Sequence, residues 1–398
     1  MVVAFWFLAV AALVLALLQL AIALGLGTRL TPAGSKTQPC VPIPAISALV
    51  PLKGAPAGLA ERLLRLLTGL RDDDQLVLAL ETEDDPGHAV VAKLRDDNPA
   101  RNITIVLSGP PGERMGKQHN LSAALARAKH DLVMFMDDDV LIERANIEEA
   151  AEVVAGALKS ETAGNLGAAF ALPFYGVSES SRPQLGGDLV AAYTNHGFAP
   201  NMASLALRSP PGFIIGGFWM TSRAALDAIG GLERFTTTVG DDAAIGRAFT
   251  DASRRNVLLR TPVRLEPERL DLGGGAAHVL KWLTLLRAEG LGVLLICYLT
   301  WNPLATGILA ALLTLAAPDL SSGTALSVLV ALLALRSLAV IALDARVLGL
   351  RPVGRYLLMQ VAYEALLAPW LFLVAAFRRE VTWRGRKYRL GPDGIVPS

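Results

Sequence analysis

The sequence is poor in cysteine and in net charge. Its two cysteines, Cys40 and Cys297, lie far apart, and the second is within an apolar run. This spacing excludes a disulfide framework and a zinc site of the CxxC type. The formal net charge is +1, so no overall electrostatic field favours nucleic acid as a partner.

Charge is also missing from long stretches of the chain. Residues 1–28 carry none, and this length is enough to span a bilayer. The stretch lacks a basic leader and a small-residue cleavage site, so we expect a retained anchor rather than a signal peptide. Hydrophobic residues make up 53% of the chain and the mean hydropathy is +0.43, which predicts a membrane protein with one sizeable polar domain.

Three further apolar runs lie in the last third of the chain. Residues 290–318 are uncharged, residues 320–343 are interrupted only by Arg336, and residues 356–377 include Glu364. A charge inside a bilayer is costly unless it is paired. We therefore expect an ion pair between Arg336 and Glu364.

The basic residues predict how the chain is oriented. Arg29 and Lys36 follow the first run and place the central domain in the cytoplasm. A basic segment follows the last run, and it would lie outside if residues 356–377 crossed the membrane. We therefore expect 356–377 to lie in the interface or to re-enter, with Glu364 and Pro369 marking its irregularity. The basic residues of the tail are Arg378, Arg379, Arg384, Arg386, Lys387 and Arg389.

Strand and helix patterns alternate between the first two apolar runs, which indicates a parallel α/β sheet. Ligands of such sheets bind beyond the carboxyl ends of the strands. Two acidic clusters, 81–85 and 137–139, fall at such ends. The expected strands are 46–50, 75–80, 102–108 and 132–136, and the expected helices are 57–70, 86–97 and 117–129.

Three carboxylates stand side by side at Asp137, Asp138 and Asp139, directly after an apolar strand. Like charges this close raise one another's pKa, so their proximity needs compensation. A divalent cation such as Mn²⁺ or Mg²⁺ would supply it, because hard cations take oxygen ligands and bridge to substrate phosphates. The alternative is a solvated acidic turn at the end of a strand.

Six blocks of sequence, in order, resemble the family 2 glycosyltransferases of the ceramide glucosyltransferase type, and the bacterial enzymes that glycosylate hopanoids look closest. The resemblance spans residues 45–390. It implies an α/β protein in which a GT-A-type, Rossmann-like cytoplasmic domain is inserted between an N-terminal transmembrane helix and a C-terminal helical membrane region. The blocks are VPLKG (50–54), ETEDDPG (81–87), GKQHNL (116–121), DDDV (137–140), VGDDAAIGRAF (239–249) and WRGRKYRL (383–390).

The resemblance implies an inverting transfer from a UDP-sugar to the hydroxyl group of a lipid. Asp137 and Asp139 would hold the metal ion, which neutralises charge on the leaving diphosphate. Asp242 would be the base that takes the proton of the acceptor hydroxyl. Alternatively, Asp241 and Asp242 cap a helix at 243–251, because acids favour that end.

Donor-binding residues are also implied, and Thr82 stands where the family has its first aspartate. Glu81 is the candidate to replace that contact to the nucleoside. Lys117 fits a point charge on phosphate, or else simply begins a surface helix. The implied donor-binding residues are Pro51, Lys53, Glu81, Asp84, Lys117, Asn120 and Asp138.

A third group is expected to bind the acceptor or to gate the site. The family's basic-x-x-Arg-Trp motif appears as HVLKW, in which lysine keeps the charge but loses the bidentate fork. Its members share one face of a helix at the bilayer surface, so membrane anchoring alone is an alternative. His196 could equally be structural. The group is His196, Gly216, Trp219, Asp241, His278, Lys281 and Trp282.

We therefore expect an integral protein of the bacterial inner membrane whose catalytic domain is cytoplasmic and whose partners are a UDP-sugar and a membrane lipid, without nucleic acid. Glucose, galactose and N-acetylglucosamine donors remain open, as do ceramide, hopanoid and diacylglycerol acceptors. The expected segments are an anchor (1–28), a linker (29–45), the glycosyltransferase domain (46–270), an interfacial amphipathic helix (271–289), membrane helices (290–377) and a basic cytoplasmic tail (378–398).

Three other functions are alternatives to a lipid glycosyltransferase. A processive polysaccharide synthase needs a polymer channel and more spans than these runs provide. An intramembrane prenyltransferase needs aspartates one helical turn apart within its spans, but residues 141 and 142 are leucine and isoleucine. A catalytically inactive membrane scaffold is favoured only by Thr82 and Lys281.

Overall fold

The computed structural model describes residues 1–31, 42–159, 165–177, 184–238, 240–314, 321–383, 385–391 and 394–397. Parts of four expected segments lie outside these residues: 32–41 of the linker, 160–164, 178–183 and 239 of the glycosyltransferase domain, 315–320 of the membrane helices, and 384, 392, 393 and 398 of the tail. The chain divides into two compact units. A helical unit comprises Met1–Pro32, Phe174–Ser204 and Pro267–Thr382, and an α/β unit comprises Ala33–Pro173, Leu205–Glu266 and Trp383–Ser398.

This division differs from the expected continuous domain at 46–270. Residues Phe174–Ser204 cluster with the helical unit, although they lie within that range. The C-terminal residues Trp383–Ser398 instead belong to the α/β unit.

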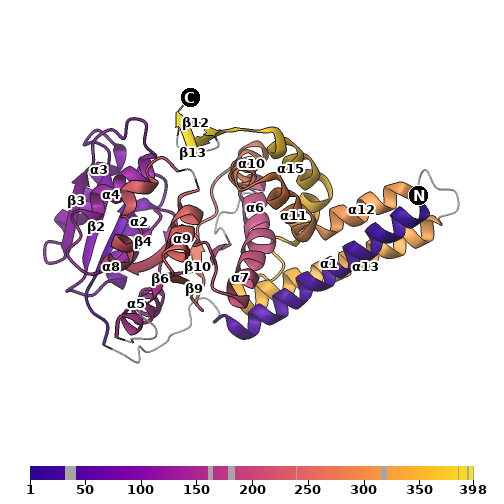
Figure 1. The fold of residues 1–398 in the computed structure, drawn as a ribbon, viewed down its shortest axis with the longest axis horizontal. Coiled ribbons are helices and arrows are strands. Elements are labelled where there is room, and N and C mark those ends of the chain that lie inside the picture. Colours follow the sequence, from indigo (N-terminus) through magenta and orange to yellow (C-terminus); the bar gives the residue numbers. More distant parts are fainter. Residues whose placement is uncertain are drawn as a thin grey trace. The chain divides into compact units, whose positions relative to one another are not determined.

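A seven-stranded sheet organises the α/β unit, in the order β3-β2-β1-β4-β8-β6-β9 (Figure 1). The first four strands pair in parallel, as expected, and β1, β2 and β4 are buried throughout. The sheet is mixed, because β8 runs antiparallel to both β4 and β6. The strands are β1 (Ile46–Pro51), β2 (Gln75–Leu80), β3 (Asn102–Leu107), β4 (Leu132–Met136), β6 (Leu166–Phe170), β8 (Phe218–Ser222) and β9 (Arg255–Leu258).

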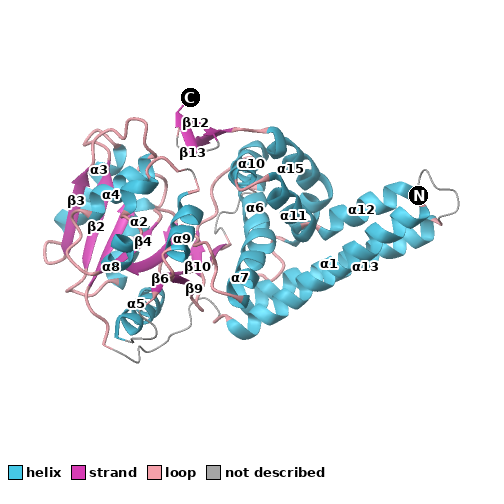
Figure 2. Ribbon diagram, viewed as in Figure 1, coloured by secondary structure: helices cyan, strands magenta, loops and turns pink. Residues whose placement is uncertain are grey.

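Helices follow the strands of this sheet (Figure 2). Helix α4 ends earlier than expected, because the N–H of Lys129 donates to the side chains of Ser47 and Gln75 instead of continuing the helix. The helices are α2 (Leu59–Gly69), α3 (Pro86–Asp97), α4 (Gly116–Leu125), α5 (Arg144–Lys159), α8 (Arg223–Ala228), η2 (Leu232–Phe235) and α9 (Asp241–Asp251). The remaining strands are β5 (Val140–Leu141), β7 (Pro173–Tyr175), β10 (Val263–Leu265), β11 (Glu380–Trp383), β12 (Arg386–Gly391) and β13 (Gly394–Pro397).

The helical unit contains long apolar helices and three π-helical turns. Helix α10 confirms the helix expected at 271–289. The elements are α1 (Val2–Arg29), α6 (Leu185–Ala192), η1 (Tyr193–Phe198), α7 (Ala199–Arg208), α10 (Leu272–Ala288), α11 (Leu291–Trp301), α12 (Pro303–Leu313), α13 (Ser322–Leu343), η4 (Asp344–Leu348), α14 (Leu357–Ala362), η5 (Tyr363–Leu367) and α15 (Ala368–Phe377).

Helices α1, α12 and α13 pack along one another (Figure 1). One end of the bundle joins Phe5 and Ala9 to Ala310 and Ala325. Further along, Ala12 and Ala16 of α1 pack with Leu304 and Leu332. A Cβ on Gly27 would lie 2.9 Å from the Cβ of Arg346. Helices α1 and α13 therefore run parallel, and α12 runs antiparallel to both.

Three helical stretches in the described residues are long and apolar enough to cross a membrane: Val2–Arg29, Ser322–Leu348 and Leu357–Phe377. The run expected to span at 290–318 is instead bent by 84° between α11 and α12. The bend falls at Asn302, whose successor Pro303 disfavours a helical conformation at the residue before it. The expected irregularity of 356–377 is present as η5, which contains Glu364 and precedes Pro369.

A buried polar network lies inside the helical unit, and each π-helical turn supplies one acid or histidine to it. Arg336 Nε donates to Glu364 Oε1 at 2.5 Å, which confirms the expected pair. Arg336 also donates to the carbonyl of His196, whose Nε2 lies 2.8 Å from Asp344 Oδ1. All four side chains are fully buried. π-helical turns are rare in proteins, and those that occur often lie at functional sites.

Candidate active site

The three aspartates after β4 differ in exposure. Asp138 is 4% exposed, and its backbone carbonyl accepts a hydrogen bond from Arg62 at 2.7 Å. Asp137 and Asp139 are half-buried on either side of it. The predicted metal ligands Asp137 and Asp139 are therefore more accessible than Asp138, which was expected to bind the donor.

Lys117, at the start of α4, places its ammonium group against the acids. Its Nζ lies 2.8 Å from Asp137 Oδ1, 3.1 Å from Asp137 Oδ2 and 3.8 Å from Asp241 Oδ2. Burial alone would lower the pKa of Lys117, but the carboxylates of Asp137 and Asp241 outweigh it and raise the pKa. Lys117 is thus a fixed positive charge in the site rather than a surface residue.

The carboxyl group of Asp137 is destabilised in its charged form. Burial raises its pKa to about 7; Lys117 opposes the shift and Asp139 adds to it. A divalent cation would stabilise the charged form of Asp137 more than the ammonium group of Lys117 does. This agrees with the sequence argument that these acids need compensation.

Asp242 lies in the first turn of α9 and is held by two backbone donors. Its Oδ2 accepts from the N–H of Gly216 at 3.1 Å, and its Oδ1 accepts from the N–H of Ala243 at 2.8 Å. Burial and then Asp241 raise its pKa to about 6. The helix cap is Gly240, so neither acid occupies the expected capping position, and Asp241 instead accepts a hydrogen bond from Gln118.

The turn at Gly216–Gly217 joins the predicted base to the predicted metal ligands. Gly216 donates to Asp242, and the carbonyl of Gly217 accepts from the N–H of Asp137 at 3.0 Å. Because β8 is antiparallel to β4, its first residues lie beside the last residues of β4. This pairing brings together acids that are far apart in the sequence.

Trp219 has a different place from the one expected. It is 3% exposed and stacks on Phe135 of β4, with ring centroids 4.0 Å apart and planes 11° apart. It is a core residue that fixes β8 on β4, because stacked aromatic pairs across strands stabilise their register. Its position is inconsistent with a direct contact to the acceptor.

A second cluster lies at the carboxyl end of β2. Glu81 accepts from Lys53 Nζ at 3.3 Å and from Arg386 Nη2 at 2.9 Å. Pro51 is buried as the last residue of β1. Arg386 was not among the predicted site residues, since its block was assigned to a basic tail.

Two predicted donor-binding residues, Asn120 and Asp84, differ in exposure. Asn120 is 2% exposed. Its side-chain amide donates to the carbonyl of Leu52 at 3.1 Å and accepts from the hydroxyl of Ser108 at 2.7 Å. Asn120 therefore links the segments that follow β1 and β3. Asp84 is exposed in a turn. Its neighbour Asp85 accepts from the N–H groups of Gly54 and Gly87, each at 2.8 Å, and caps α3.

The donor set fits a hard cation. Within the described residues, no group of three or more His, Cys, Asp or Glu side chains is arranged to hold a metal ion. Asp137 and Asp139 supply carboxylate oxygens, and an ammonium group already lies against Asp137. Mg²⁺ and Mn²⁺ are commonly held by one or two carboxylates together with substrate phosphates, so two protein ligands suffice.

The remaining predicted residues belong to the helical unit. His196 is completely buried against Asp344. On α10, His278 Nδ1 lies 3.2 Å from Glu268, Lys281 Nζ lies 3.3 Å from His278 Nε2, and the ring of His278 packs edge-on against Trp282. The HVLKW residues therefore share one face of their helix, as their spacing indicates.

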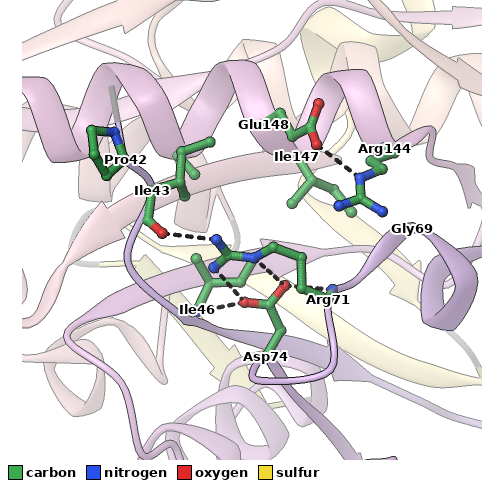
Figure 3. A pocket seen from close by; sticks show the side chains of 10 residues that line it. Pro42, Ile43, Ile46, Gly69, Arg71, Asp74, Arg144, Ile147 and Glu148 are labelled. Atoms are coloured by element: carbon green, nitrogen blue, oxygen red, sulfur yellow. Dashed lines mark hydrogen bonds and ion pairs between the residues drawn. The ribbon is translucent and has the colours of Figure 1, made fainter. Parts of the chain in front are cut away.

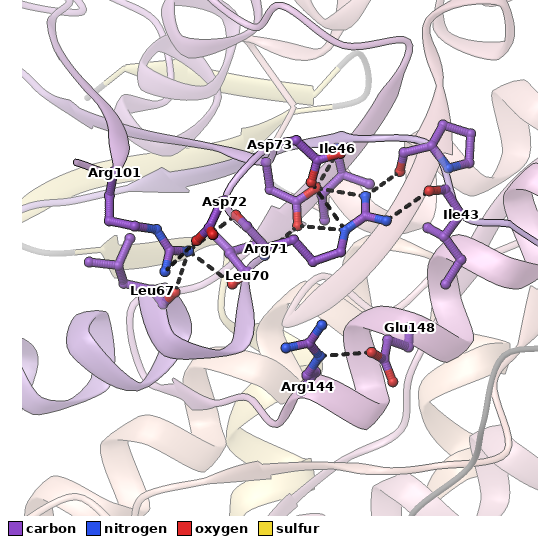
Figure 4. Close-up of polar contacts among 12 residues, drawn as sticks. Ile43, Ile46, Leu67, Leu70, Arg71, Asp72, Asp73, Arg101, Arg144 and Glu148 are labelled. Atoms are coloured by element: carbon purple, nitrogen blue, oxygen red, sulfur yellow. Dashed lines mark hydrogen bonds and ion pairs between the residues drawn. The ribbon is translucent and has the colours of Figure 1, made fainter.

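A cavity of about 220 Å³ lies at the opposite edge of the sheet, near the first residues of β1 and β2 (Figure 3). It is lined by Ile43, Arg71 and Asp74, among others. Arg71 donates to Asp74 Oδ1 at 2.9 Å and to the carbonyl of Ile43 at 2.7 Å (Figure 4). These contacts close the loop before β2, and the cavity is separate from the acids.

Comparison with known proteins gives one family and several similar proteins. Ceramide glucosyltransferase 1 of Caenorhabditis elegans is 22% identical over 224 residues, which are 54% of this chain and 44% of that protein. The match therefore spans less than half of the curated relative's length.

Two solved structures are also similar. The mannosyltransferase PcManGT of Pyrobaculum calidifontis, in complex with GDP-Man and Mn²⁺, has a TM-score of 0.49 and 17% identity, over 90% of this chain and 99% of that chain. A glucosyl-3-phosphoglycerate synthase of Mycobacterium tuberculosis, in complex with Mn²⁺ and UDP, has a TM-score of 0.38 and 16% identity, over 65% of this chain and 86% of that chain.

The family model of glycosyl transferase family 21 matches residues 4–396. The matching family carries the number 21, whereas the sequence blocks suggested family 2. The relative from Caenorhabditis elegans is a ceramide glucosyltransferase, the type that the sequence blocks resemble. The chain belongs to glycosyl transferase family 21.

Proposed function

We propose that the protein is a membrane-bound inverting glycosyltransferase that moves a hexose or N-acetylhexosamine from a UDP-sugar to the hydroxyl group of a lipid. One observation carries this proposal: the Gly216–Gly217 turn holds Asp242 and Asp137 on its two sides, with Lys117 against the acids. A base, a cation site and a fixed positive charge thus occur together at the carboxyl ends of the strands.

In this mechanism Asp242 is the general base. The N–H groups of Gly216 and Ala243 hold its two oxygens, so the carboxylate keeps one orientation. It takes the proton of the acceptor hydroxyl as that oxygen attacks the anomeric carbon. A single displacement inverts the configuration at that carbon, so one base is enough.

Asp137, Asp139 and Lys117 are proposed to stabilise the leaving diphosphate. Asp137 and Asp139 would hold a divalent cation, which would supply Lewis-acid stabilisation of that leaving group. Lys117 binds phosphate oxygen as a point charge. Glu81, beside Lys53, is the proposed contact to the nucleoside in place of the aspartate that Thr82 replaces. Asn120 and Asp138 support these groups from within.

The proposal of a lipid acceptor is supported by the helical unit. Three of its helical stretches could cross a membrane. On α10, the basic and aromatic face of Lys281 and Trp282 suits the interface between head groups and water. A ceramide or hopanoid alcohol would present its hydroxyl at that depth. His278 and Lys281 remain proposed acceptor or gating residues, whereas the fully buried His196 is proposed only for gating.

The proposed location is the bacterial inner membrane, with the catalytic unit in the cytoplasm. Arg29 and Arg346 lie at the same end of the α1–α12–α13 bundle, as the positive-inside rule requires. The tail after Phe377 is also basic. If both ends of Leu357–Phe377 are cytoplasmic, this stretch makes no net crossing, in line with the sequence expectation.

The test is a transfer assay with the full chain in lipid nanodiscs. Labelled UDP-glucose, UDP-galactose and UDP-N-acetylglucosamine are each combined with Mn²⁺ and with ceramide, hopanoid alcohol or diacylglycerol, and the glycolipid is identified by mass. We expect one donor and one lipid to give product, and the Asp242→Asn variant to give none. Absence of product from every pair, with UDP still bound, would favour the inactive scaffold.

A further inference from the structure

The C-terminal segment carries an arginine into the candidate active site. Arg386 lies on β12, and its Nη2 donates to Glu81 Oε2 at 2.9 Å. Its Nη1 lies 3.8 Å from the point where a Cβ on Gly116 would stand, and Gly116 is the first residue of α4. Arg386 therefore lies between the end of β2 and the start of the helix that carries Lys117.

The second guanidinium nitrogen lacks an acceptor. Nη1 of Arg386 is buried and has no hydrogen-bond partner among the residues that the structure describes. The Arg386 side chain is 34% exposed as a whole, but Nη1 itself is shielded from solvent. An unmet donor on a shielded atom is costly, because water does not replace the missing partner. The neighbouring start of α4 has no side-chain cap either. Both features favour an anion at this place.

We propose that Arg386 is a donor-binding residue whose Nη1 binds a phosphate oxygen of the nucleotide sugar. This inference rests on the proposed function. A guanidinium group can hold Glu81 with one nitrogen and phosphate with the other, because its donors form a rigid fork. Lysine at this position could keep the charge without making both contacts in that geometry.

Pairing of β12 with β13 holds Arg386 in place. In β12 successive side chains face opposite sides of the strand. Tyr388, on the same side as Arg386, is 5% exposed, whereas Lys387 and Arg389 are exposed. Backbone pairing of Tyr388 with Pro397 in β13 fixes the strand. Arg389 is therefore a matched control: a basic residue of the same strand that faces solvent.

The test is calorimetric titration of the full chain in nanodiscs with UDP and with uridine, each in the presence of Mn²⁺. We expect Arg386→Ala to weaken UDP binding by roughly ten- to a hundredfold, the range for a hydrogen bond to a charged group, and to weaken uridine binding much less, because uridine has no phosphate. Arg386→Lys should lose part of the affinity, and Arg389→Ala should bind as the wild type does.

Three outcomes would overturn the inference. Equal UDP affinity of Arg386→Ala and the wild type would remove Arg386 from the donor site. Equal losses for UDP and uridine would place the contact on the nucleoside instead. If Arg386 acts only by holding Glu81, its replacement would cost nothing further in a Glu81→Ala background, which has no acceptor at residue 81, whereas we expect a further loss there.

Folding and the wider proposal are checked separately. The melting temperature of each variant shows whether it folds, and Arg386→Lys keeps the charge where Arg386→Ala is unstable. A wild-type chain that binds no UDP with Mn²⁺ would contradict the proposed function itself. Binding by the wild type together with undiminished binding by both Arg386 variants would contradict this inference alone.

Discussion

The N–H of Gly216 donates to Asp242 at 3.1 Å, so a residue without a side chain orients the proposed base. A Cβ at Gly216 would lie 3.4 Å from both Asp242 Oδ2 and Lys117 Nζ. At that distance a methyl group would be in van der Waals contact with both groups, so neither could shift toward it during the reaction. Small displacements of catalytic groups are costly to rate, because reacting atoms must be aligned closely.

Gly216→Ala should therefore lower kcat by about tenfold or more with a smaller effect on donor affinity. The control is Gly212→Ala, since a Cβ at Gly212 meets nothing within 4 Å. Steady-state kinetics of both variants give the comparison. Wild-type kcat in Gly216→Ala would contradict the proposal that the Gly216 position constrains the base.

The pH dependence of the reaction should report Asp242. Burial and Asp241 raise its pKa to about 6, and only the deprotonated form can accept a proton. The rate should therefore fall as pH drops below about 6 and level off above it. Asp242→Asn should lower the rate by about 10²–10⁴-fold and abolish this acid limb. A profile of kcat/KM against pH that is flat from 5 to 8 would contradict the assignment.

Removal of the predicted metal ligands should affect metal and nucleotide together. Asp137→Ala and Asp139→Ala should lose the increase in UDP affinity that Mn²⁺ gives, because each removes a carboxylate ligand. Asp72→Ala serves as control, since the Asp72 side chain is 98% exposed in the loop before β2. Retention of the Mn²⁺ effect in both ligand variants would eliminate this cation site.

The neighbouring acids Asp84 and Asp85 should differ in their effect on stability. Asp85 accepts from Gly54 and Gly87 and caps α3, so Asp85→Ala should cost about 0.5–2 kcal/mol of folding stability. Asp84→Ala should leave the melting temperature within error of the wild type. Equal effects of the two substitutions would show that the cap contributes little.

Loss of one member of the Arg336–Glu364 pair should destabilise the helical unit. Removing either partner leaves a buried charge uncompensated, which costs about 3–5 kcal/mol. Arg336→Ala and Glu364→Gln should lower the yield of folded protein, whereas Arg351→Ala, at an exposed position, should not. Exchange of the two charges in a double variant should restore part of the yield. Single variants with wild-type yield would show that the pair is dispensable.

Local sequence patterns predicted the local elements of the α/β unit well. The strands at 75–80 and 132–136 and the helix at 86–97 have the expected bounds. Each has its own signal: a short apolar run for the strands, and Asp85 followed by Pro86 for the start of the helix. The Arg336–Glu364 pair was predictable for the same reason, because an isolated charge in an apolar run requires a partner.

Features that depend on long-range pairing were not predictable in this way. Because β8 is inserted antiparallel beside β4, Gly216 and Gly217 contact Asp242 and Asp137. The sequence of β8 alone does not indicate which strands lie beside it. Trp219 was assigned to the acceptor group, although a tryptophan close to two glycines is equally compatible with core and surface. Arg386 was assigned to a basic cytoplasmic tail, because its basic neighbours hid the alternation that marks β12.

The three π-helical turns constrain how the helical unit can vary. Two of these turns, η1 and η5, each accommodate one extra residue between α-helical segments, whereas η4 ends α13. Deleting the extra residue from η1 or η5 would rotate the helix that follows by about 100°. These two helices therefore cannot be shortened by single residues without changing how His196 or Glu364 meets Asp344 and Arg336.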